Sequence, residues 1–287
     1  WRRCMTIPDG CQLTIERMAF INRAPMYPRT GWNSGGIFVH TVQPTTFRYC
    51  AFDSVYRAVV DAIDTLPPPP LRVRYMIEDC RFTNAPRIRV RASESGSMVI
   101  RRSYFRGHRC TSWLVLGGDS TSLEDCVFEG DSVAGALYVR GENLLVRDCV
   151  FGPIDTCTSP AIDIRNRSRA VVQNNIVSDI LFPNSPAVTL SHEDFDDPDT
   201  IFFHHNSFMN IHASGLNGTS SIYVVRSVNL LSGISAQIDS NVFANNVQTA
   251  AARPKAVYAS TPVTLSGNRF LNLQPASSAT LWFSTNP

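Results

Sequence analysis

One short alternation of apolar and polar positions recurs along the whole chain. In "LEDCVF" at 123–128, an apolar residue is followed by two polar positions, a small residue, a variable residue and a phenylalanine, and "VRDCVF" at 146–151 repeats this word. The general form is apolar-x-x-(Cys, Ser, Asn or Met)-x-(Phe or Val). It occurs ten times, with its fourth letter at positions 18, 50, 80, 103, 126, 149, 175, 206, 241 and 268. The shortest interval, 23 residues, predicts a solenoid whose coils share one unit and differ in their loops.

A second, shorter pattern lies between these words. Stretches of the form apolar-x-apolar, rich in β-branched and aromatic residues and bordered by Gly, Pro, Ser or Asn, are typical of short strands with one buried face. They occur at 37–39, 88–90, 113–115, 137–139, 162–164, 188–190, 222–224, 257–259 and 281–283. Each coil is therefore expected to contain at least two strands.

Helical periodicity is confined to one stretch, "DSVYRAVVDAIDTL" at 53–66. Asp53 or Ser54 is suited to cap an amphipathic turn there, and four prolines at 67–70 would end it. We predict that 53–70 forms an inserted helix followed by a Pro-rich excursion.

Short strands repeated at this period stack so that each strand pairs with its counterpart one coil away. The fold class is all-β, and the architecture is a parallel β-helix, a solenoid of about ten coils roughly 40–50 Å long. We expect residues 1–287 to form a single β-helix domain that is a segment of a longer chain. Because uncovered coils expose strand edges, further coils or partner chains are expected at both ends.

Stacking coils place the same letter of each word in one internal column. The sixth letter predicts a column of nine phenylalanines interrupted by Val177. The fourth letter predicts a second column, in which asparagine amides bond one coil to the next and cysteines act as small apolar fillers. Its members are Met18, Cys50, Cys80, Ser103, Cys126, Cys149, Asn175, Asn206, Asn241 and Asn268.

These columns resemble the stacked aromatics and the asparagine ladder of the right-handed parallel β-helices of the pectin-lyase-like superfamily. The resemblance covers about residues 13–283. "SGGIFV" at 34–39 and "FANN" at 243–246 look like short repeats of polymorphic outer-membrane proteins, and the Arg-rich, Cys-containing coils are similar to dispersed-gene-family surface proteins. The superfamily contains lyases, glycoside hydrolases, tailspikes and surface proteins, so the resemblance implies a right-handed fold and leaves the function open.

The residues give little support to an enzyme of that superfamily. A hydrolase needs clustered carboxylates. Only two short stretches, Asp196-Asp197 and "RGHR" at 106–109, resemble parts of the hydrolase motifs, and the remaining parts are missing. A lyase needs an Arg or Lys base, and Lys255 is the only lysine. "FFHHNSF" at 202–208 looks like a lyase strand, but its Asn206 is equally a letter of the repeat word. We therefore assign no catalytic residue.

A cluster of arginines is the sharper candidate site. In "RIRVR" at 87–91 the two apolar residues point inward, so the three arginines share an outer face. With neighbouring coils this face suits anionic glycans, whereas nucleic acid is disfavoured because aromatic platforms are not interleaved. An ion-paired surface neutralised by Glu78, Asp79 and Glu94 is the equal alternative. The candidate binding residues are Arg72, Arg74, Arg87, Arg89, Arg91, Arg101 and Arg102.

Two weaker signals concern metal and glycan attachment. The loop "SHEDFDDPDT" concentrates hard oxygen ligands that could hold Ca²⁺, although a solvated acidic loop is the simpler interpretation. Its candidate ligands are Glu193, Asp194, Asp196, Asp197 and Asp199. Asn166 and Asn217 begin N-glycosylation sequons in predicted turns, which favours an extracellular or cell-surface location. No other cofactor is expected.

The leading hypothesis is a non-catalytic β-helical segment of a secreted or cell-surface protein, acting as a rigid spacer and interaction surface for anionic glycans. The first alternative is a polysaccharide lyase or glycoside hydrolase, which would gather carboxylates, or a cation with a facing Arg or Lys, in one groove. The second is an intracellular scaffold with reduced thiols and unmodified sequons. No apolar run of the chain reaches the roughly 18–20 residues that a membrane-spanning helix needs.

Overall fold

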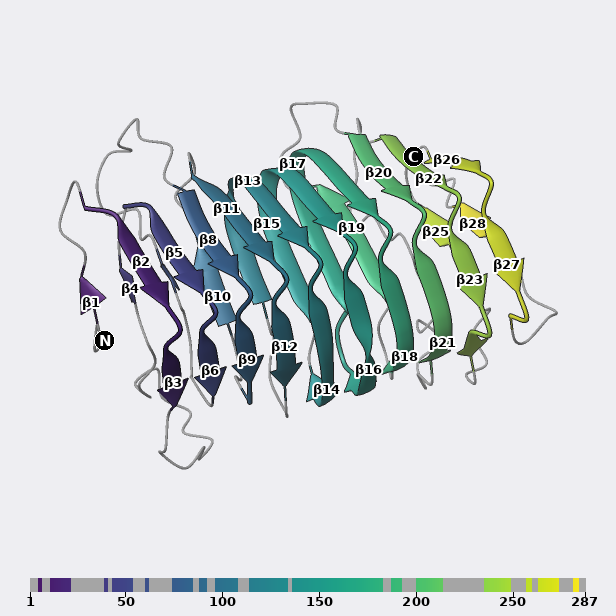
Figure 1. The fold of residues 1–287 in the computed structure, drawn as a ribbon. Coiled ribbons are helices and arrows are strands. Elements are labelled where there is room, and N and C mark those ends of the chain that lie inside the picture. The colour runs from purple at the N-terminus through teal and green to yellow at the C-terminus, as the bar shows by residue number, and fades with distance from the viewer. Residues whose placement is uncertain are drawn as a thin grey trace.

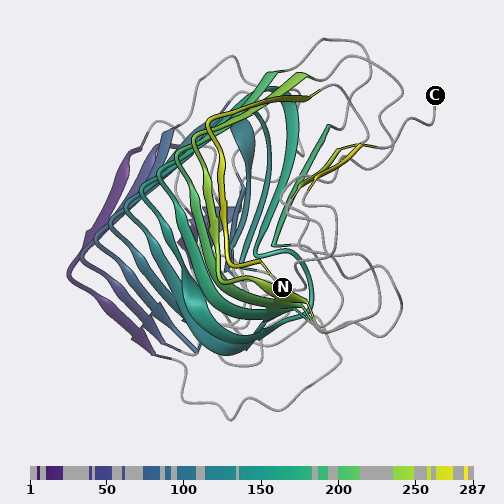
Figure 2. The same ribbon diagram turned by 90° about the vertical axis from the view of Figure 1, so that its right-hand side faces the viewer.

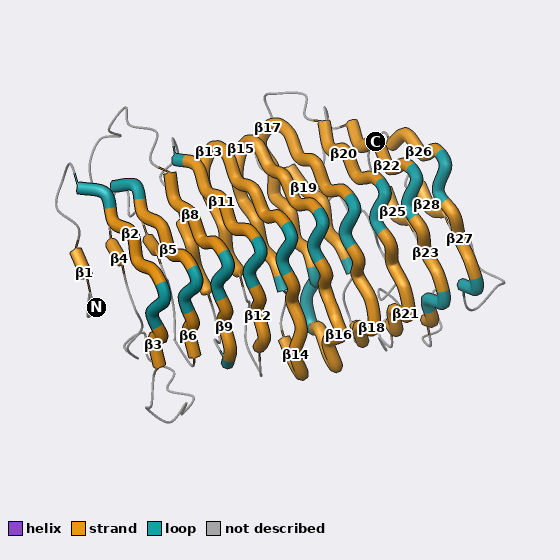
Figure 3. The backbone as a smooth tube through the Cα atoms, viewed as in Figure 1, coloured by secondary structure: helices purple, strands orange, loops and turns teal. Residues whose placement is uncertain are grey.

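The fold is known from a computed structural model of the full chain, and every described element is a strand (Figures 1 and 3). The described residues are 5–6, 11–21, 39–40, 43–53, 60–61, 74–84, 88–91, 96–107, 114–133, 136–182, 187–192, 200–213, 235–248, 257–259, 263–273 and 281–283.

The larger sheet contains fifteen strands, and all of its recorded pairs are parallel. Its order is β1-β4-β7-β10-β13-β15-β17-β20-β22-β26, with β2, β5, β8, β11 and β19 beside this path. The bounds are Met5–Thr6 (β1), Leu13–Glu16 (β2), Val39–His40 (β4), Thr45–Arg48 (β5), Val60–Asp61 (β7), Arg74–Glu78 (β8), Ile88–Arg91 (β10), Ser97–Arg101 (β11), Leu114–Glu124 (β13), Leu137–Arg147 (β15), Ile162–Gln173 (β17), Val188–His192 (β19), Thr200–His204 (β20), Ser235–Asp239 (β22) and Val263–Ser266 (β26).

The second sheet contains eleven strands, with β24 beside its main path, and a third sheet pairs β25 with β28. The strands of the second sheet are Ala19–Ile21 (β3), Ala51–Asp53 (β6), Arg81–Thr83 (β9), Tyr104–Gly107 (β12), Val127–Val133 (β14), Val150–Cys157 (β16), Ile176–Phe182 (β18), Ser207–Ala213 (β21), Val242–Ala244 (β23), Val247–Gln248 (β24) and Arg269–Leu271 (β27). The third sheet consists of Val257–Ala259 (β25) and Leu281–Phe283 (β28).

A sharp bend joins the two large sheets inside every repeat word. The third letter of each word has a left-handed backbone, with φ between 47° and 60°, and this single residue turns the chain from one sheet into the other. Figure 2 shows the bends of successive coils aligned in a row along the stack. Asp, Asn and Gly tolerate this conformation best, and they occupy five of the ten positions: Asp79, Asp125, Asp148, Asn174 and Gly267. The repeated parallel pairing gives the predicted parallel β-helix.

The phenylalanine column is confirmed. From Phe20 to Phe151 the rings stack face to face across successive coils, with centroids 4.6–5.0 Å apart. Val177 interrupts the column, which resumes from Phe208 through Phe243 to Phe270. These rings fill the space between the sheets, so inter-coil pairing and core packing reinforce each other.

The fourth-letter column is confirmed from Cys50 onward. Asn206 shows the ladder bonding: its backbone N–H and its side-chain amide both donate to Asn241 Oδ1, and its amide also donates to the Val172 carbonyl. The Cys149 N–H donates to Asn175 Oδ1 in the same way, and Ser103 Oγ accepts from the Cys80 N–H. The column therefore satisfies polar groups at the bend that would be costly to bury unpaired.

The cysteines of this column are buried free thiols, as predicted. Each donates to the carbonyl two residues earlier, for example Cys126 Sγ to the Glu124 carbonyl at 3.2 Å. Burial raises the pKa of Cys80 to about 12, so this thiol stays protonated at neutral pH. The thiols act as small fillers with a local hydrogen bond.

Three details of the sequence analysis were wrong. Met18 is 51% exposed, because it lies on the terminal coil of the described stack. Within the predicted helix of 53–66, Val60 and Asp61 form β7, which pairs in parallel with β4 and β10. Pairing with neighbouring coils overrides the local helical pattern there; the rest of 54–70 lies outside the described residues. Asn166 lies within β17, paired with Gly141, rather than in a turn.

Candidate functional site

The predicted arginine cluster divides between two parts of the coil. Arg91 in β10 pairs with Gly117, whereas Arg101 in β11 pairs with Glu124, seven residues further along β13. An extended strand of that length spans about 23 Å. Arg89 lies with Arg91 on β10. Arg72 and Arg87 lie outside the described residues. Among the described residues, Arg101 is therefore set apart from Arg89 and Arg91 along the strand direction, and the shared basic face stays a prediction.

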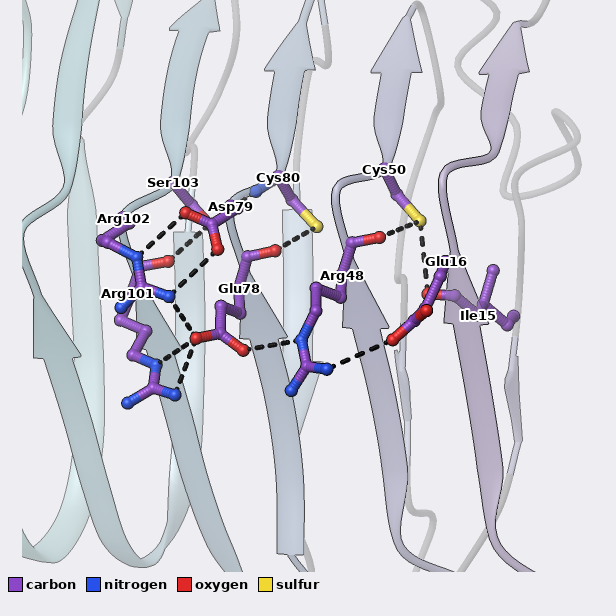
Figure 4. A network of polar contacts seen from close by, with 10 residues as sticks. All are labelled: Ile15, Glu16, Arg48, Cys50, Glu78, Asp79, Cys80, Arg101, Arg102 and Ser103. Carbon is purple, nitrogen blue, oxygen red and sulfur yellow. Dashed lines mark hydrogen bonds and ion pairs between the residues drawn. The ribbon is translucent and has the colours of Figure 1, made fainter.

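Arg101 and Arg102 surround one buried carboxylate. Glu78 ends β8 on the outer side of the sheet, yet it is only 4% exposed because guanidinium groups cover it. Arg101 Nε donates to its Oε1 at 2.8 Å, Arg48 Nε donates to its Oε2 at 2.9 Å, and Arg102 Nη2 also contacts Oε1 (Figure 4). Three arginines thus share one glutamate.

The network extends to further carboxylates on both sides. Arg48 Nη1 reaches Glu16 Oε1 at 3.2 Å, one coil earlier. Arg102 binds Asp79 with two nitrogens, at 2.9 and 3.0 Å. Together the network contains three arginines and three carboxylates, so its formal charge is zero. The ion-paired alternative therefore describes this part of the cluster.

The Glu124–Arg147 ion pair continues this pairing between the next two coils. Arg147 Nη2 lies 2.6 Å from Glu124 Oε2, and Ser122 Oγ also donates to this carboxylate. Across six successive coils the second letter of the word alternates in sign: Glu16, Arg48, Glu78, Arg101, Glu124 and Arg147. The sequence signal for this charge ladder is the second letter of the word, whereas the predicted columns rest on the fourth and sixth letters.

The charge ladder shifts the pKa values of its members. Burial alone would raise the pKa of Glu78, but hydrogen bonds from Arg102, Arg48 and Arg101 outweigh it and hold this pKa below its ordinary value. The pKa of Glu124 is lowered likewise, since bonds from Ser122 and Arg147 outweigh its desolvation. The pKa of Arg48 is raised by its bond to Glu78.

The charge ladder predicts an acid-sensitive contribution to stability. Because the pKa of Glu78 is lowered on folding from 4.5, its stabilisation is complete above the unfolded pKa and is lost as pH falls through the folded pKa. We expect Glu78→Gln to lower the free energy of unfolding by about 1–3 kcal/mol at pH 7. The loss should lie in the lower part of this range, because the arginines reach solvent, which screens the ion pairs. Urea unfolding from pH 7 to pH 3 measures this difference.

The control for this prediction is Glu142→Gln, since Glu142 is exposed on β15 and forms none of the ion pairs recorded among the described residues. It should behave like the wild type throughout. The difference between Glu78→Gln and the wild type should shrink towards zero at the acid end. A difference that stays constant with pH would show that the Glu78 ion pairs contribute nothing.

Arginines also lie over aromatic rings of the following coil. The Arg81 guanidinium is 5.2 Å from the Tyr104 ring centroid, and that of Arg169 is 5.4 Å from the Phe202 ring. Both rings are half-buried and each is covered by a guanidinium group. Arg74, at the start of β8, is exposed and joins none of the ion pairs recorded within the described part of the chain.

The histidines singled out in the sequence follow the repeat. His204 ends β20, His205 occupies the left-handed bend with φ 56°, and Asn206 is a buried member of the asparagine ladder. The two Nδ1 atoms lie 2.9 Å apart. The ladder role of Asn206 is therefore confirmed. Asp196, Asp197, His108 and Lys255, the other letters weighed for catalysis, lie outside the described residues.

The calcium and glycosylation predictions fall mostly outside the described residues. The acidic loop from Glu193 to Asp199 and the sequon at Asn217 lie in undescribed segments. Within the described ranges, no three His, Cys, Asp or Glu side chains are grouped to hold a metal ion. The same part of the chain contains no helix able to cross a membrane.

Comparison with known proteins agrees with this geometry. Residues 35–228, more than half of the chain, match the family model described as "Right handed beta helix region". No curated protein and no solved structure matches the chain.

Proposed function

The chain belongs to the right-handed beta helix family, and we propose that it is a rigid, non-catalytic segment of a secreted or cell-surface protein. One observation carries this proposal: the polar letters of the repeat word bond to neighbouring coils. The second letter forms the charge ladder and the fourth forms the asparagine ladder. A rod held along its length in this way suits a spacer that keeps other parts of a protein apart.

We place the glycan contact on arginines outside the neutral network. Arg74 is exposed at the start of β8, and Arg89 and Arg91 lie on β10. Planar guanidinium groups bind sulfates and carboxylates with paired hydrogen bonds, so these positions suit an anionic glycan laid across neighbouring coils. The secreted or surface location is supported by the sequon at Asn217, since Asn166 lies within β17 rather than in a turn.

The glycan contact predicts a selective loss of binding. Immobilised heparin serves as the sulfated probe and should retain the wild type. The triple variant Arg74→Ser, Arg89→Ser, Arg91→Ser should elute at lower salt, because the sulfates of heparin lose their guanidinium partners. Arg147→Ser is the matched control, since this arginine is already paired with Glu124. Equal elution of the triple variant and the wild type would refute the contact.

The same samples separate the spacer from an enzyme. Acidic polysaccharides incubated with the wild type should keep their chain-length distribution, as measured by size-exclusion chromatography. Shortened chains would overturn the non-catalytic proposal and favour a lyase or glycoside hydrolase. This outcome is independent of the heparin result, because a spacer need not bind glycans.

A further inference from the structure

Two adjacent histidines face each other on the outer side of the rod. In a regular strand successive side chains point to opposite faces, so a straight continuation of β20 would separate His204 from His205. Instead His204 ends β20, and His205 occupies the left-handed bend with φ 56°. The bend turns the second ring back beside the first, and the two Nδ1 atoms lie 2.9 Å apart. The repeat therefore brings two imidazole nitrogens together on one surface.

The backbone that carries both rings is held from the two neighbouring coils. The His204 carbonyl accepts from the Asn174 N–H of the preceding coil at 3.3 Å, and the His205 N–H donates to the Asp239 carbonyl of the following coil at 3.2 Å. The next residue, Asn206, is a buried member of the asparagine ladder. A binding site is most precise when its ligands stand on rigid elements. Only the side-chain torsions of the two histidines remain to be adjusted.

The surroundings of the two rings favour a cation. In the second-letter column His204 lies between Gln173 and Asp239, one coil away on either side. The alternating charge ladder ends at Arg147, two coils earlier. A neutral amide and a carboxylate thus flank the ring in this column, so a positive ion meets attraction there instead of the repulsion of an adjacent guanidinium.

The spacing of the two nitrogens selects a coordination geometry. On the scale of a zinc–imidazole bond, two ligands at a right angle lie about 2.8–3.0 Å apart, and two at the tetrahedral angle about 3.3–3.4 Å apart. The 2.9 Å between the Nδ1 atoms matches the right angle. Right-angled nitrogen ligands are typical of the square-planar or tetragonal sites of Cu(II) and Ni(II), and Cu(II) binds most strongly of the first-row divalent ions.

We propose that His204 and His205 bind one Cu(II) ion through their Nδ1 atoms, at neighbouring corners of a tetragonal site on the outside of the rod. Water completes the coordination, because no three His, Cys, Asp or Glu side chains are grouped for a metal within the described ranges. The Asp239 carboxylate, one coil further on, balances part of the charge of the ion. The proposal goes beyond the spacer function and is independent of the glycan contact.

Binding replaces one hydrogen bond by two metal bonds without a net loss of protons. In the metal-free chain one Nδ1 carries a hydrogen and donates it to the other. When copper binds, the donor ring releases this hydrogen to solvent and takes one up on Nε2, so both rings stay neutral. The exposed His205 ring turns about its side-chain torsions until both lone pairs meet at the ion.

Isothermal calorimetry of the full chain with copper chloride tests the site, with glycine in the buffer as a weak competing chelator. The two test variants are His204→Gln and His205→Asn, which copy Gln173 and Asn174 from the same letters of the preceding coil and so preserve the outer face and the bend. The wild type should bind one Cu(II) roughly tenfold or more tightly than either variant, because the second ring acts as a tethered ligand.

His212→Gln is the matched control. His212 is exposed on β21, and its register neighbours are Leu181 and Val247, so it lacks a second imidazole on the adjoining strands. This variant should bind copper like the wild type. The remaining histidines are present in every sample and contribute the same background. Thermal unfolding without copper checks that each variant is folded.

Electron paramagnetic resonance of the copper-loaded samples identifies the ligands. The wild type should give a tetragonal spectrum with coupling to two imidazole nitrogens, and each single variant should show one. Equal copper affinity in the wild type, His204→Gln and His205→Asn would mean binding by scattered surface histidines and would overturn the proposal. Coupling to a single nitrogen in the wild type, or an equal loss of affinity in His212→Gln, would overturn it as well.

Discussion

Replacing Phe128 by Ala should lower the free energy of unfolding by about 3–5 kcal/mol. The ring is fully buried and lies between Phe105 and Phe151, with centroids 4.7 and 4.8 Å away. Truncation removes its transfer free energy and leaves a cavity that the hydrogen-bonded strands on both sides cannot close. Urea unfolding followed by circular dichroism measures the loss.

The matched control is Val150→Ala, one position before Phe151, because Val150 is half-buried on the outer face of the same sheet. Its cost should be about 1 kcal/mol or less, since less surface is uncovered and no internal cavity forms. A Phe128 variant as stable as the Val150 variant would show that the phenylalanine column does not carry the core.

Replacing Asn206 by Ala should be comparably severe, at about 3–5 kcal/mol, because several buried polar groups lose their partners at once. Its amide donates to Val172 and Asn241, and its Oδ1 accepts from both nitrogens of Asn175. These groups are buried from bulk solvent, since Asn175, Asn206 and Asn241 are at most 1% exposed. The same unfolding measurement applies.

Asn143→Ala is the control for the asparagine ladder. Asn143 is exposed and donates one long bond, 3.4 Å, to the Asp119 carbonyl. Its replacement should change stability by about 0.5 kcal/mol or less. If Asn206→Ala were equally mild, the ladder would be a geometric coincidence with no energetic weight.

The architecture was predictable because each coil repeats the same bend and the same buried positions. A small or amide residue at the bend and a phenylalanine two places later recur in eight of the ten words, Met18 and Val177 being the exceptions, so Cys126 and Phe128 predicted the positions of Cys149 and Phe151. A single word of this kind would be ambiguous. Ten in register leave only a stacked arrangement with one inner and one outer face.

What the sequence did not reveal depends on neighbouring coils rather than on local pattern. Val60 and Asp61 look helical in isolation, but β4 and β10 offer parallel partners on both sides. The arginine positions indicated a basic surface. The net charge of that surface depends on which carboxylates lie one coil away, as Glu78 shows.

The central claim is that equivalent letters of successive coils lie directly over one another inside the rod. Nuclear Overhauser contacts between phenylalanine rings, in protein labelled only at Phe, test it most directly. The account predicts ring contacts from Phe128 to both Phe105 and Phe151, whose centroids are 4.7 and 4.8 Å from it. It predicts none between Phe151 and Phe208, which Val177 separates by two coil spacings, about 9.6 Å. A missing contact between Phe128 and Phe151, or a strong one between Phe151 and Phe208, would contradict the stacked register.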